Sequence, residues 1–309
     1  MHVAPDDFCC QLAKAELHLH LEGSIEPETL NEIAPGRSLD EVRARYRYDD
    51  FGGFLQAFKW VVQHLNTPAD YAHAARRLLE SLERQNVRYA EITLSAGVVL
   101  WRQQDFAGIY DALVKEAARS RVDVWWVLDC IRQFGVEPAW AVARLAVERA
   151  GDRVVAFGIG GDEAAAPAAQ FHDVFRFALE RGLKLVPHAG EAAGPESIWE
   201  ALEGGAHRIG HGIAAAQDAK LMRHLRERGI PLEICITSNL CTGVATRETH
   251  PVRRLFDAGV PIILNSDDPA MFETTLSGEY ALARDFYGFT ENELAELARV
   301  SFSHGFRSK

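Results

Sequence analysis

Histidine and carboxylate residues gather at the ends of several short apolar segments of this chain of 309 residues. These segments end in His18-Leu19-His20, His188-Ala189-Gly190-Glu191, His211-Gly212 and Asp267-Asp268-Pro269. A strand that ends in such a residue presents its side chain at the edge of a sheet, and parallel strands end at the same edge. The sequence therefore predicts one site that is assembled from segments far apart along the chain.

Four of these residues form a candidate set of metal ligands. His18 and His20 are two apart on an expected strand, so both imidazoles face the same side and can reach one ion. An H-x-H pair is a weak signal, and a structural or accidental origin explains it equally well. With His188 and Asp267 the set becomes three histidines and an aspartate, which suits zinc or another divalent first-row ion. Taken singly, His188 is also explained as a packed core histidine, and Asp267 as a helix N-cap before Pro269.

Three further residues are candidates for the acid and base chemistry that a metal-activated water requires. Glu191 follows His188 by three residues, and its carboxyl could protonate a ring nitrogen of a substrate if its surroundings keep it neutral. His211 and Asp268 are placed to hold the attacking water. The alternatives are that Glu191 is a charge in the first turn of a helix and that His211 packs at the end of a strand.

A group of glycines precedes the acidic pair Asp162-Glu163. Gly158, Gly160 and Gly161 would let backbone N–H groups approach a ligand closely, although a tight turn alone explains the same residues. The group lacks the third glycine of a dinucleotide-binding loop, and the chain contains neither a G-x-S-x-G nor an H-E-x-x-H motif.

The elements that must position these residues alternate between strands and helices. Runs rich in Val and Ile without strict alternation predict strands that are buried on both faces. The predicted strands are 15–21, 87–94, 122–131, 154–160, 183–188, 208–213, 231–236 and 260–265. Apolar residues at helical spacing predict helices over 70–85, 105–119, 138–150, 168–181, 195–203 and 217–228. This alternation predicts an α/β fold, a TIM-type (β/α)₈ barrel that forms a single domain over residues 1–309.

One interval is too long for a simple barrel. Between the first two strands, residues of about 23–86 form an insertion where one helix would suffice. The insertion contains the aromatic residues Phe51, Phe54, Phe58 and Trp60. We expect a helical insertion that either buries its own satellite core or covers the barrel mouth as a lid, and the sequence supports both equally.

Bulk composition excludes several classes of partner. The net charge of −11 argues against nucleic acid and against an anionic membrane surface. The five cysteines form no C-x-x-C pair, which is typical of reduced thiols in a cytoplasmic protein. Residues 1–14 lack the apolar segment of a signal peptide. The expected partner is therefore a small molecule, and the sequence leaves the oligomeric state open.

Taken together, the motifs resemble the adenosine deaminase family of the metal-dependent amidohydrolase superfamily. The matching segments run in order from about residue 15 to 305: His18-Leu19-His20-Leu21-Glu22-Gly23-Ser24, Gly161-Asp162-Glu163, His188-Ala189-Gly190-Glu191, His211-Gly212, Thr237-Ser238-Asn239 and Ser266-Asp267-Asp268-Pro269. The resemblance implies one zinc ion per chain at the C-terminal mouth of the barrel. It implies His18, His20, His188 and Asp267 as the zinc ligands.

The resemblance also implies a role for each candidate catalytic residue. Glu191 would donate a proton to N1 of a purine. His211 would orient and activate the attacking water, with Asp268 assisting and hydrogen-bonding the base. The backbone N–H of Gly161 would contact the purine ring. The expected substrate-binding residues are Gly161, His20, Glu22 and Asp268.

Three departures from the family pattern bear on the substrate. The family usually carries Asp, which contacts the sugar 5′-hydroxyl, where this chain has Glu22. Its Asp-Leu-Ala-Gly-Asp-Glu motif begins here with Gly158, and its Cys-Pro-x-Ser-Asn motif has Ile236 in place of proline. None of these changes affects the expected metal chemistry, but each concerns substrate identity.

The predicted activity is zinc-dependent hydrolytic deamination of the 6-amino group of adenosine or a 5′-substituted adenosine, which releases ammonia. Within the family, the alternatives are deamination of aminodeoxyfutalosine in menaquinone biosynthesis, of adenine, or of methylated adenine nucleotides. Two further hypotheses are a zinc hydrolase of another amide or ester bond, and an inactive nucleoside-binding relative. The position of Glu191 argues against the first of these, and the complete residue set argues against the second.

Overall fold

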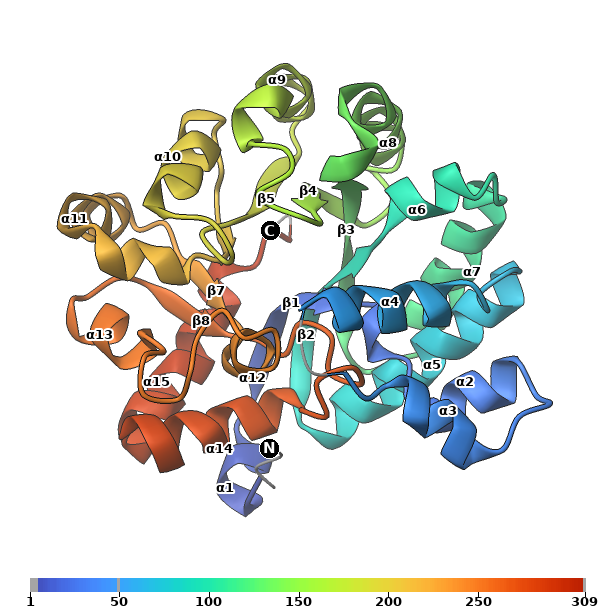
Figure 1. Ribbon diagram of the computed structural model, residues 1–309, viewed down its shortest axis with the longest axis horizontal. Coiled ribbons are helices and arrows are strands. Elements are labelled where there is room, and N and C mark those ends of the chain that lie inside the picture. The colour runs from blue at the N-terminus through green and yellow to red at the C-terminus, as the bar shows by residue number, and fades with distance from the viewer. Residues whose placement is uncertain (1–4, 49–50, 308–309) are drawn as a thin grey trace.

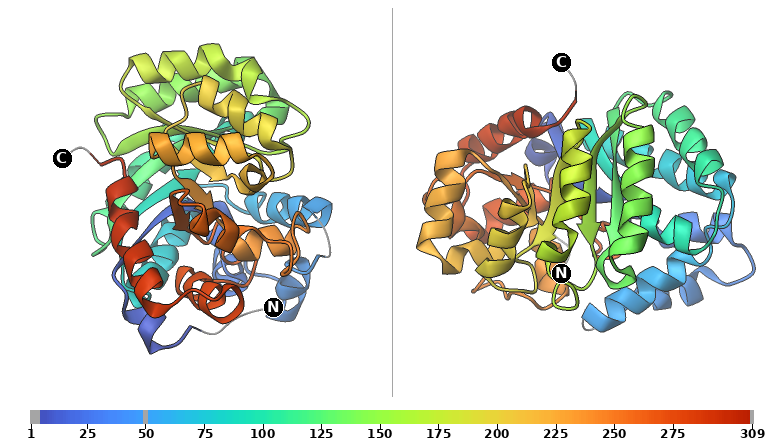
Figure 2. Two further views of the ribbon diagram at one scale, coloured as in Figure 1. Left: turned by 90° about the vertical axis from the view of Figure 1, so that its left-hand side faces the viewer. Right: turned by 90° about the horizontal axis from the view of Figure 1, so that it is seen from above.

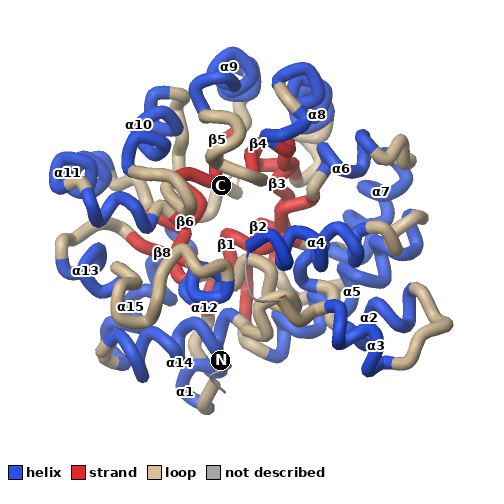
Figure 3. Tube along the Cα trace, in the orientation of Figure 1, coloured by secondary structure: helices blue, strands red, loops and turns tan. Residues whose placement is uncertain are grey.

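Eight parallel strands surround the centre of the molecule and pair in the order of the chain, β1 to β8. This computed structural model describes residues 5–48 and 51–307. The ring closes where Leu19 of β1 pairs with Asp267 after β8. Helices enclose the ring on the outside (Figures 1 and 3), so the predicted TIM-type barrel is confirmed. The strands are β1 (Lys14–His20), β2 (Val87–Leu94), β3 (Asp123–Ile131), β4 (Val154–Gly160), β5 (Lys184–Ala189), β6 (Ile209–His211), β7 (Leu232–Ile234) and β8 (Ile262–Leu264).

The helices fall into two groups. The first group precedes β2: α1 (Asp7–Gln11), the 3₁₀ turn η1 (Glu22–Ser24), α2 (Pro27–Ile33), α3 (Leu39–Arg45), α4 (Phe51–Val62) and α5 (Pro68–Arg84). The second follows β2: α6 (Ala96–Trp101), α7 (Phe106–Ala117), η2 (Arg132–Phe134), α8 (Val136–Glu148), η3 (Ala168–Phe171), α9 (His172–Glu180), α10 (Pro195–Glu203), η4 (Ile213–Gln217), α11 (Ala219–Arg228), α12 (Ile236–Cys241), α13 (Val252–Asp257), α14 (Leu276–Tyr287), α15 (Glu291–Ser301) and η5 (Phe302–His304). No helix in the described ranges is both long and apolar enough to cross a membrane.

A β-bulge in the first strand aims the two histidines of the H-x-H pair. Glu16 pairs with Ala90 of β2, but the next paired residue is Leu19 with Ile92, so β1 holds one extra residue here. The N–H groups of Leu17 and His18 both donate to Oδ1 of Asn265, at 2.8 and 3.1 Å. Because one extra residue reverses which face the following side chains occupy, the bulge sets His18 and His20 toward the barrel interior.

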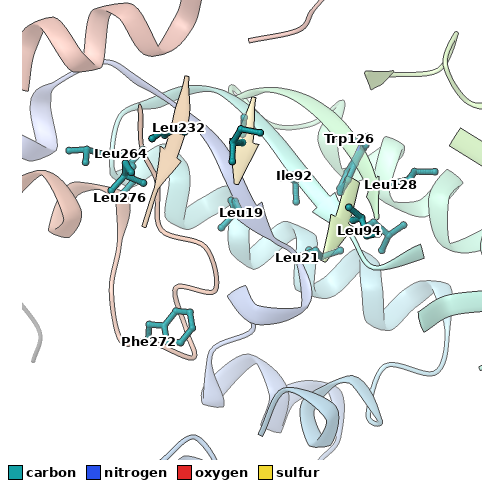
Figure 4. Close-up of a cluster of buried hydrophobic side chains, with 14 of the residues drawn as sticks. Leu19, Leu21, Ile92, Leu94, Trp126, Leu128, Leu232, Leu264, Phe272 and Leu276 are labelled. Carbon is teal, nitrogen blue, oxygen red and sulfur yellow. The ribbon is translucent and has the colours of Figure 1, made fainter. Parts of the chain in front are cut away.

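The opposite face of the strands packs against the helices. Leu19, Ile92 and Trp126 occupy neighbouring register positions on β1, β2 and β3, and all three are fully buried. Figure 4 shows them with Leu128 and Leu232 in one apolar cluster. This packing holds the strands rigidly, so side chains at the strand ends have fixed positions.

The predicted insertion after the first strand is present and helical. The elements η1 and α2 to α5 lie between β1 and β2. Figure 1 shows α4 beside the ends of β1 and β2. Phe54 stacks on Phe272 at 5.0 Å between ring centroids and contacts Phe58 at 6.0 Å, which forms an apolar cluster between α4 and the segment after β8. The side chain of Phe51 lies outside the described part of the chain.

The C-terminal tail closes the opposite end of the barrel. Figure 2 (left) shows the tail and the α4 helix on opposite sides of the strands. Phe306 packs with Val127, Val155 and Val186 of β3, β4 and β5. The barrel therefore has one end filled by the tail and one end at which the strand-end residues are gathered.

The predicted elements agree with the structure except near the later strands. The predicted strands 208–213 and 231–236 shorten to β6 and β7, because His211 has a positive φ of 59° and Ile236 begins α12. The predicted helix 168–181 divides into η3 and α9. Outside the insertion, helices α1, α6 and α12 to α15 were not predicted. The apolar residues of α12 continue directly from the preceding strand.

Candidate metal centre and active site

The four predicted metal ligands converge at the C-terminal end of the barrel. His18, His20, His188 and Asp267 each offer a ligand atom, and these atoms lie within 4.8 Å of one another. Nε2 of His20 lies 3.3 Å from Nε2 of His188, and Oδ1 of Asp267 lies 3.3 and 3.4 Å from Nε2 of His18 and His20. A tetrahedral ion with bonds of about 2.0–2.1 Å separates its ligands by about 3.3–3.4 Å. These three separations therefore match those between ligands of a single divalent ion, which the four donors would hold.

Neighbouring groups orient two of these ligands toward the centre. Nδ1 of His18 lies 2.8 Å from Oε2 of Glu233. When the Nδ1–H group donates a hydrogen bond to this carboxylate, the lone pair of Nε2 is free to coordinate a metal. That Nε2 is buried and makes no hydrogen bond within the described structure. Ser238 donates its hydroxyl to Oδ2 of Asp267 at 2.7 Å, which leaves Oδ1 toward the histidines. A buried imidazole nitrogen without a hydrogen-bond partner, next to a carboxylate, is typical of a metal ligand.

The backbone after β8 is strained where it carries Asp267. Its φ is 64°, in the left-handed region that a non-glycine residue seldom adopts. Its N–H donates to the carbonyl of His18 at 3.0 Å, and its carbonyl accepts from His20 N–H at 2.9 Å. The buried carboxyl of Glu16 accepts from the N–H and hydroxyl of Ser266. These contacts fix the strained residue against the strand that carries two other ligands.

Glu191 lies beside the metal cluster at the wall of a cavity. Its Oε2 is 3.6 Å from Nε2 of His211. Burial raises the pKa of Glu191 above its ordinary value, because the neutral carboxyl is favoured away from water. A carboxyl that keeps its proton near neutral pH can serve as a general acid.

A second carboxylate, Glu163, holds the loop that carries Glu191. Its two oxygens accept from four consecutive backbone N–H groups, those of residues 190 to 193, and from the hydroxyl of Ser197. Burial favours the neutral form, but these hydrogen bonds hold the pKa of Glu163 below its ordinary value. Because Glu163 follows the glycine-rich segment of β4, this carboxylate joins the loops after β4 and β5.

His211 is held by a short polar chain. Nδ2 of Asn239 lies 3.2 Å from Nδ1 of His211, and Oδ1 of Asn239 lies 3.2 Å from Nε2 of His250. In this arrangement the Asn239 amide donates to Nδ1, so the neutral imidazole carries its proton on Nε2. That N–H points toward Glu191 and Asp267, where it can hold an oxygen near the cluster.

Three more buried carboxyls surround the site. Burial and the charge of Asp267 raise the pKa of Asp268 well above its ordinary value. Burial also raises the pKa of Glu22 to about 7 and that of Asp129 to about 8. The protonated forms of these groups can donate hydrogen bonds to nitrogen or oxygen acceptors. Asp129 and Asp268 line the cavity, whereas Glu22 is not among the lining residues and accepts from Ser95 N–H at 3.0 Å.

The cavity runs from the metal cluster toward the insertion and has a volume of about 450 Å³. Its inner end is lined by His20, His188, Glu191, His211, Asp267 and Asp268. Its outer wall is mainly apolar, with Phe54, Leu55, Phe58, Val62, Trp101 and Phe134. Gly161 lies on one side with φ of 95°, a conformation that is strained for other residues, and a Cβ there would displace the end of the Gln133 side chain. A pocket of this size with few polar groups suits a small organic ligand.

The structure thus brings together all the predicted metal and catalytic residues and Gly161. Their chemical roles, and the substrate contact expected of Glu22, remain predictions. Four residues that hold the site, namely Glu163, Glu233, Asn239 and Asp129, were not predicted from the sequence. Glu163 and Asn239 stand within the motifs that resemble the family, and Asp129 lies near the end of β3, where a site residue of a barrel is expected.

Comparison with known proteins agrees with this geometry. The protein-family model described as adenosine deaminase matches residues 13–309 of this chain. An aminodeoxyfutalosine deaminase of Streptomyces avermitilis is 40% identical over 319 residues, which cover 97% of this chain and 88% of that protein. An adenine deaminase of Rhizobium leguminosarum bv. trifolii is 33% identical over 306 residues, which cover 96% of this chain and 95% of that protein.

Solved structures show the same similarity. The crystal structure of adenine deaminase from Arthrobacter aurescens superposes with a TM-score of 0.89 at 27% identity, and covers 99% of this chain and 95% of that one. The match to the family therefore extends over the whole barrel and includes every segment that forms the cluster. Together with the His/Asp cluster, it implies a divalent metal ion. The chain belongs to the adenosine deaminase family and is a metal-dependent hydrolytic deaminase that acts on a C–N bond.

Proposed function

We propose that the chain uses one zinc ion to remove the 6-amino group of a purine nucleoside, namely adenosine or an adenosine with a 5′ substituent. His18, His20, His188 and Asp267 would hold the ion, since their donor atoms lie close enough together to bind one ion. A divalent ion in this position lowers the pKa of a bound water to about 7 and so supplies the nucleophile. The observation that carries the proposal is the position of the buried Glu191 beside this cluster, where burial raises the pKa of its carboxyl above the ordinary value.

The remaining residues would position the purine and move its protons. Glu191 would give its proton to N1 as the water oxygen bonds to C6. His211 would hold that oxygen through its Nε2 hydrogen. Asp268 would donate to a ring nitrogen from its protonated carboxyl, and Gly161 N–H would fix the opposite edge of the ring. The proton of the added hydroxyl would then pass to the amino group, so that cleavage of the C6–N bond would release ammonia and leave a 6-oxopurine, while Glu191 would regain a proton from solvent.

Two observations favour a substrate larger than a free base. The cavity extends beyond the metal cluster to an outer wall formed by α4, α6 and η2, so a purine at the inner end leaves space for further groups. The aminodeoxyfutalosine deaminases are 39–40% identical to this chain, against 33% for the adenine deaminase of Rhizobium leguminosarum. Aminodeoxyfutalosine is therefore the second candidate, and adenine is the third.

The insertion is proposed as the cover of the barrel mouth. Five residues of α4, namely Phe54, Leu55, Phe58, Lys59 and Val62, line the cavity on the side away from the strands. The same helix also packs on Phe272, so it contributes both to an apolar cluster and to the wall of the cavity. We also propose a cytoplasmic location, which is supported by five cysteines that are all free thiols.

A deamination screen tests the substrate assignment. Ammonia release and the change in purine absorbance would be followed with adenine, adenosine, 5′-methylthioadenosine, S-adenosylhomocysteine and aminodeoxyfutalosine. The proposal expects kcat/KM for at least one nucleoside to exceed that for adenine by about tenfold or more, because binding energy from the rest of the substrate contributes to catalysis. The zinc-loaded Glu191→Gln variant serves as the control for contaminating deaminases. Preferred turnover of adenine would contradict the proposal.

A further inference from the structure

A chain of buried charged groups runs from the metal cluster down the interior of the barrel. Nδ1 of His18 bonds to Oε2 of Glu233 at 2.8 Å, and the other oxygen of Glu233 accepts from Nε of Arg208. Nη2 of Arg208 donates in turn to Oε2 of Glu91 on β2. The side chains of Glu91, Arg208 and Glu233 are at most 1% exposed. The interior of such barrels is normally filled by branched apolar residues, so three charged groups here are unusual.

The far end of this chain is completed by the C-terminal tail. Nη1 of Arg208 donates to the carbonyl of His304 at 2.7 Å, and Oε1 of Glu91 accepts from the N–H of Phe306 at 2.5 Å. The ring of Phe306 covers the guanidinium of Arg208, whose central carbon lies 3.8 Å from the ring centroid. Tyr89 donates its hydroxyl to the same oxygen of Glu91 at 2.6 Å.

These contacts satisfy the charged groups only when the tail is docked. Both oxygens of Glu91, both oxygens of Glu233 and three nitrogens of Arg208 have partners, and the tail supplies two of those partners. Buried ions are stable only with such complete pairing. If the tail undocked, the Arg208 side chain could rotate and water could reach it. Glu233 would then lose the partner that holds it against His18.

We propose that Glu233 and Arg208 are positioning residues for the metal ligand His18, and that docking of the tail at the closed end of the barrel locks them. Retention of the metal at the open end would then depend on His304 and Phe306 at the other end. This inference rests on the proposed metal site. A carboxylate that orders a ligating imidazole typically contributes a factor of about 10–100 to metal affinity.

The test measures metal binding rather than turnover. Zinc dissociation would be followed with a chromogenic chelator, and the zinc Kd would be obtained by competition, for the full-length protein and four variants. Glu233→Gln should weaken zinc binding about 10–100-fold, and Glu233→Asp serves if the first variant does not fold. Phe306→Leu keeps an apolar side chain but removes the ring from Arg208, and it should speed zinc release several-fold.

Phe302→Ala provides the matched control. Phe302 belongs to the same tail and packs at the same end of the barrel, against Ala15, Leu17, Tyr89 and Ile263, and its ring is not stacked on Arg208. Both tail variants should lower the unfolding midpoint of the metal-free protein, but only Phe306→Leu should change zinc release. Equal zinc release from the two variants would overturn the role of the tail, and an unchanged Kd in Glu233→Gln and Glu233→Asp would overturn the role of Glu233.

The outcome is separable from that of the proposed function. If the wild-type protein retains zinc but deaminates none of the nucleosides in the screen, the substrate assignment fails while the coupling to the tail can still be measured. If the wild-type protein retains no divalent metal, the ligand set itself is wrong, and the inference falls with it.

Discussion

Replacing Glu163 by glutamine should loosen the loop that carries Glu191 and leave the metal ligands in place. The carboxylate accepts five hydrogen bonds, three of them at Oε2 and two at Oε1. In the variant, the amide oxygen can keep the three bonds at Oε2, and the hydroxyl of Ser197 can turn to accept from the new NH₂ group. The N–H of Gly190 then faces a donor and loses its partner.

The size of the effect follows from these contacts. A hydrogen bond to a charged group contributes about 1.5–3 kcal/mol and a neutral one about 1 kcal/mol, so the three retained bonds weaken by at least about 1.5 kcal/mol in total. An unpaired buried N–H adds about 1–3 kcal/mol. Since Ala192 is exposed and water can reach part of the loop, we expect the lower end of the range, a loss of about 2.5 kcal/mol in the free energy of unfolding.

The assay combines urea denaturation with steady-state kinetics on the zinc-loaded protein. Besides the loss of stability, kcat should fall by at least about tenfold, because a mobile acid forfeits part of the factor of about 10²–10⁴ that a positioned one provides. Zinc content should be unchanged. Asp162→Asn is the matched control, since this half-buried neighbour accepts one backbone N–H, that of Ala164. A Glu163→Gln variant that equals the control in stability and kcat would refute the assigned role of Glu163.

Three other changes test the site residue by residue. Glu191→Gln should keep zinc and lower kcat by about 10²–10⁴-fold. In the wild type, kcat/KM should fall as the pH rises through the raised pKa of Glu191, because only the protonated carboxyl can donate a proton. A kcat/KM that stays constant at alkaline pH would argue against Glu191 as the acid. His188→Ala should abolish stoichiometric zinc in elemental analysis, and full zinc content would remove His188 from the ligand set. Gly161→Ala should raise KM, since its Cβ would collide with Gln133; an unchanged KM would show that this wall does not contact substrate.

The sequence predicted the barrel and the residues of the metal cluster because both depend on local signals. Strand-end residues are next to the apolar runs that form the strands, so His188 and Asp267 could be placed at one edge without knowledge of the packing. Glu233 and Arg208 could not, because a charged residue within or beside a short strand does not reveal which partner lies across the barrel. The shape of the cavity depends on how α4 packs, and this packing is determined by contacts with distant residues such as Phe272.

Strands β6 and β7 are both shorter than predicted, and for the same reason. The strands β6 and β7 are short because the chain turns away directly after His211 and Cys235. Apolar residues continue beyond both strands, in η4 and α12, where they pack among other helices. Hydrophobicity alone therefore predicts longer strands, and it contains no signal for the left-handed backbone of His211.

The left-handed conformations of Asp267 and His211 also affect how the protein survives in the cell. Each such residue costs on the order of 1–3 kcal/mol, and interactions with the ion compensate part of that cost. A freshly synthesised chain that has not yet acquired its ion is therefore less resistant to proteases than the mature enzyme. If the ion is zinc, as proposed, zinc starvation should increase degradation of the metal-free form, and the abundance of the enzyme should then follow the supply of the ion as well as its gene expression.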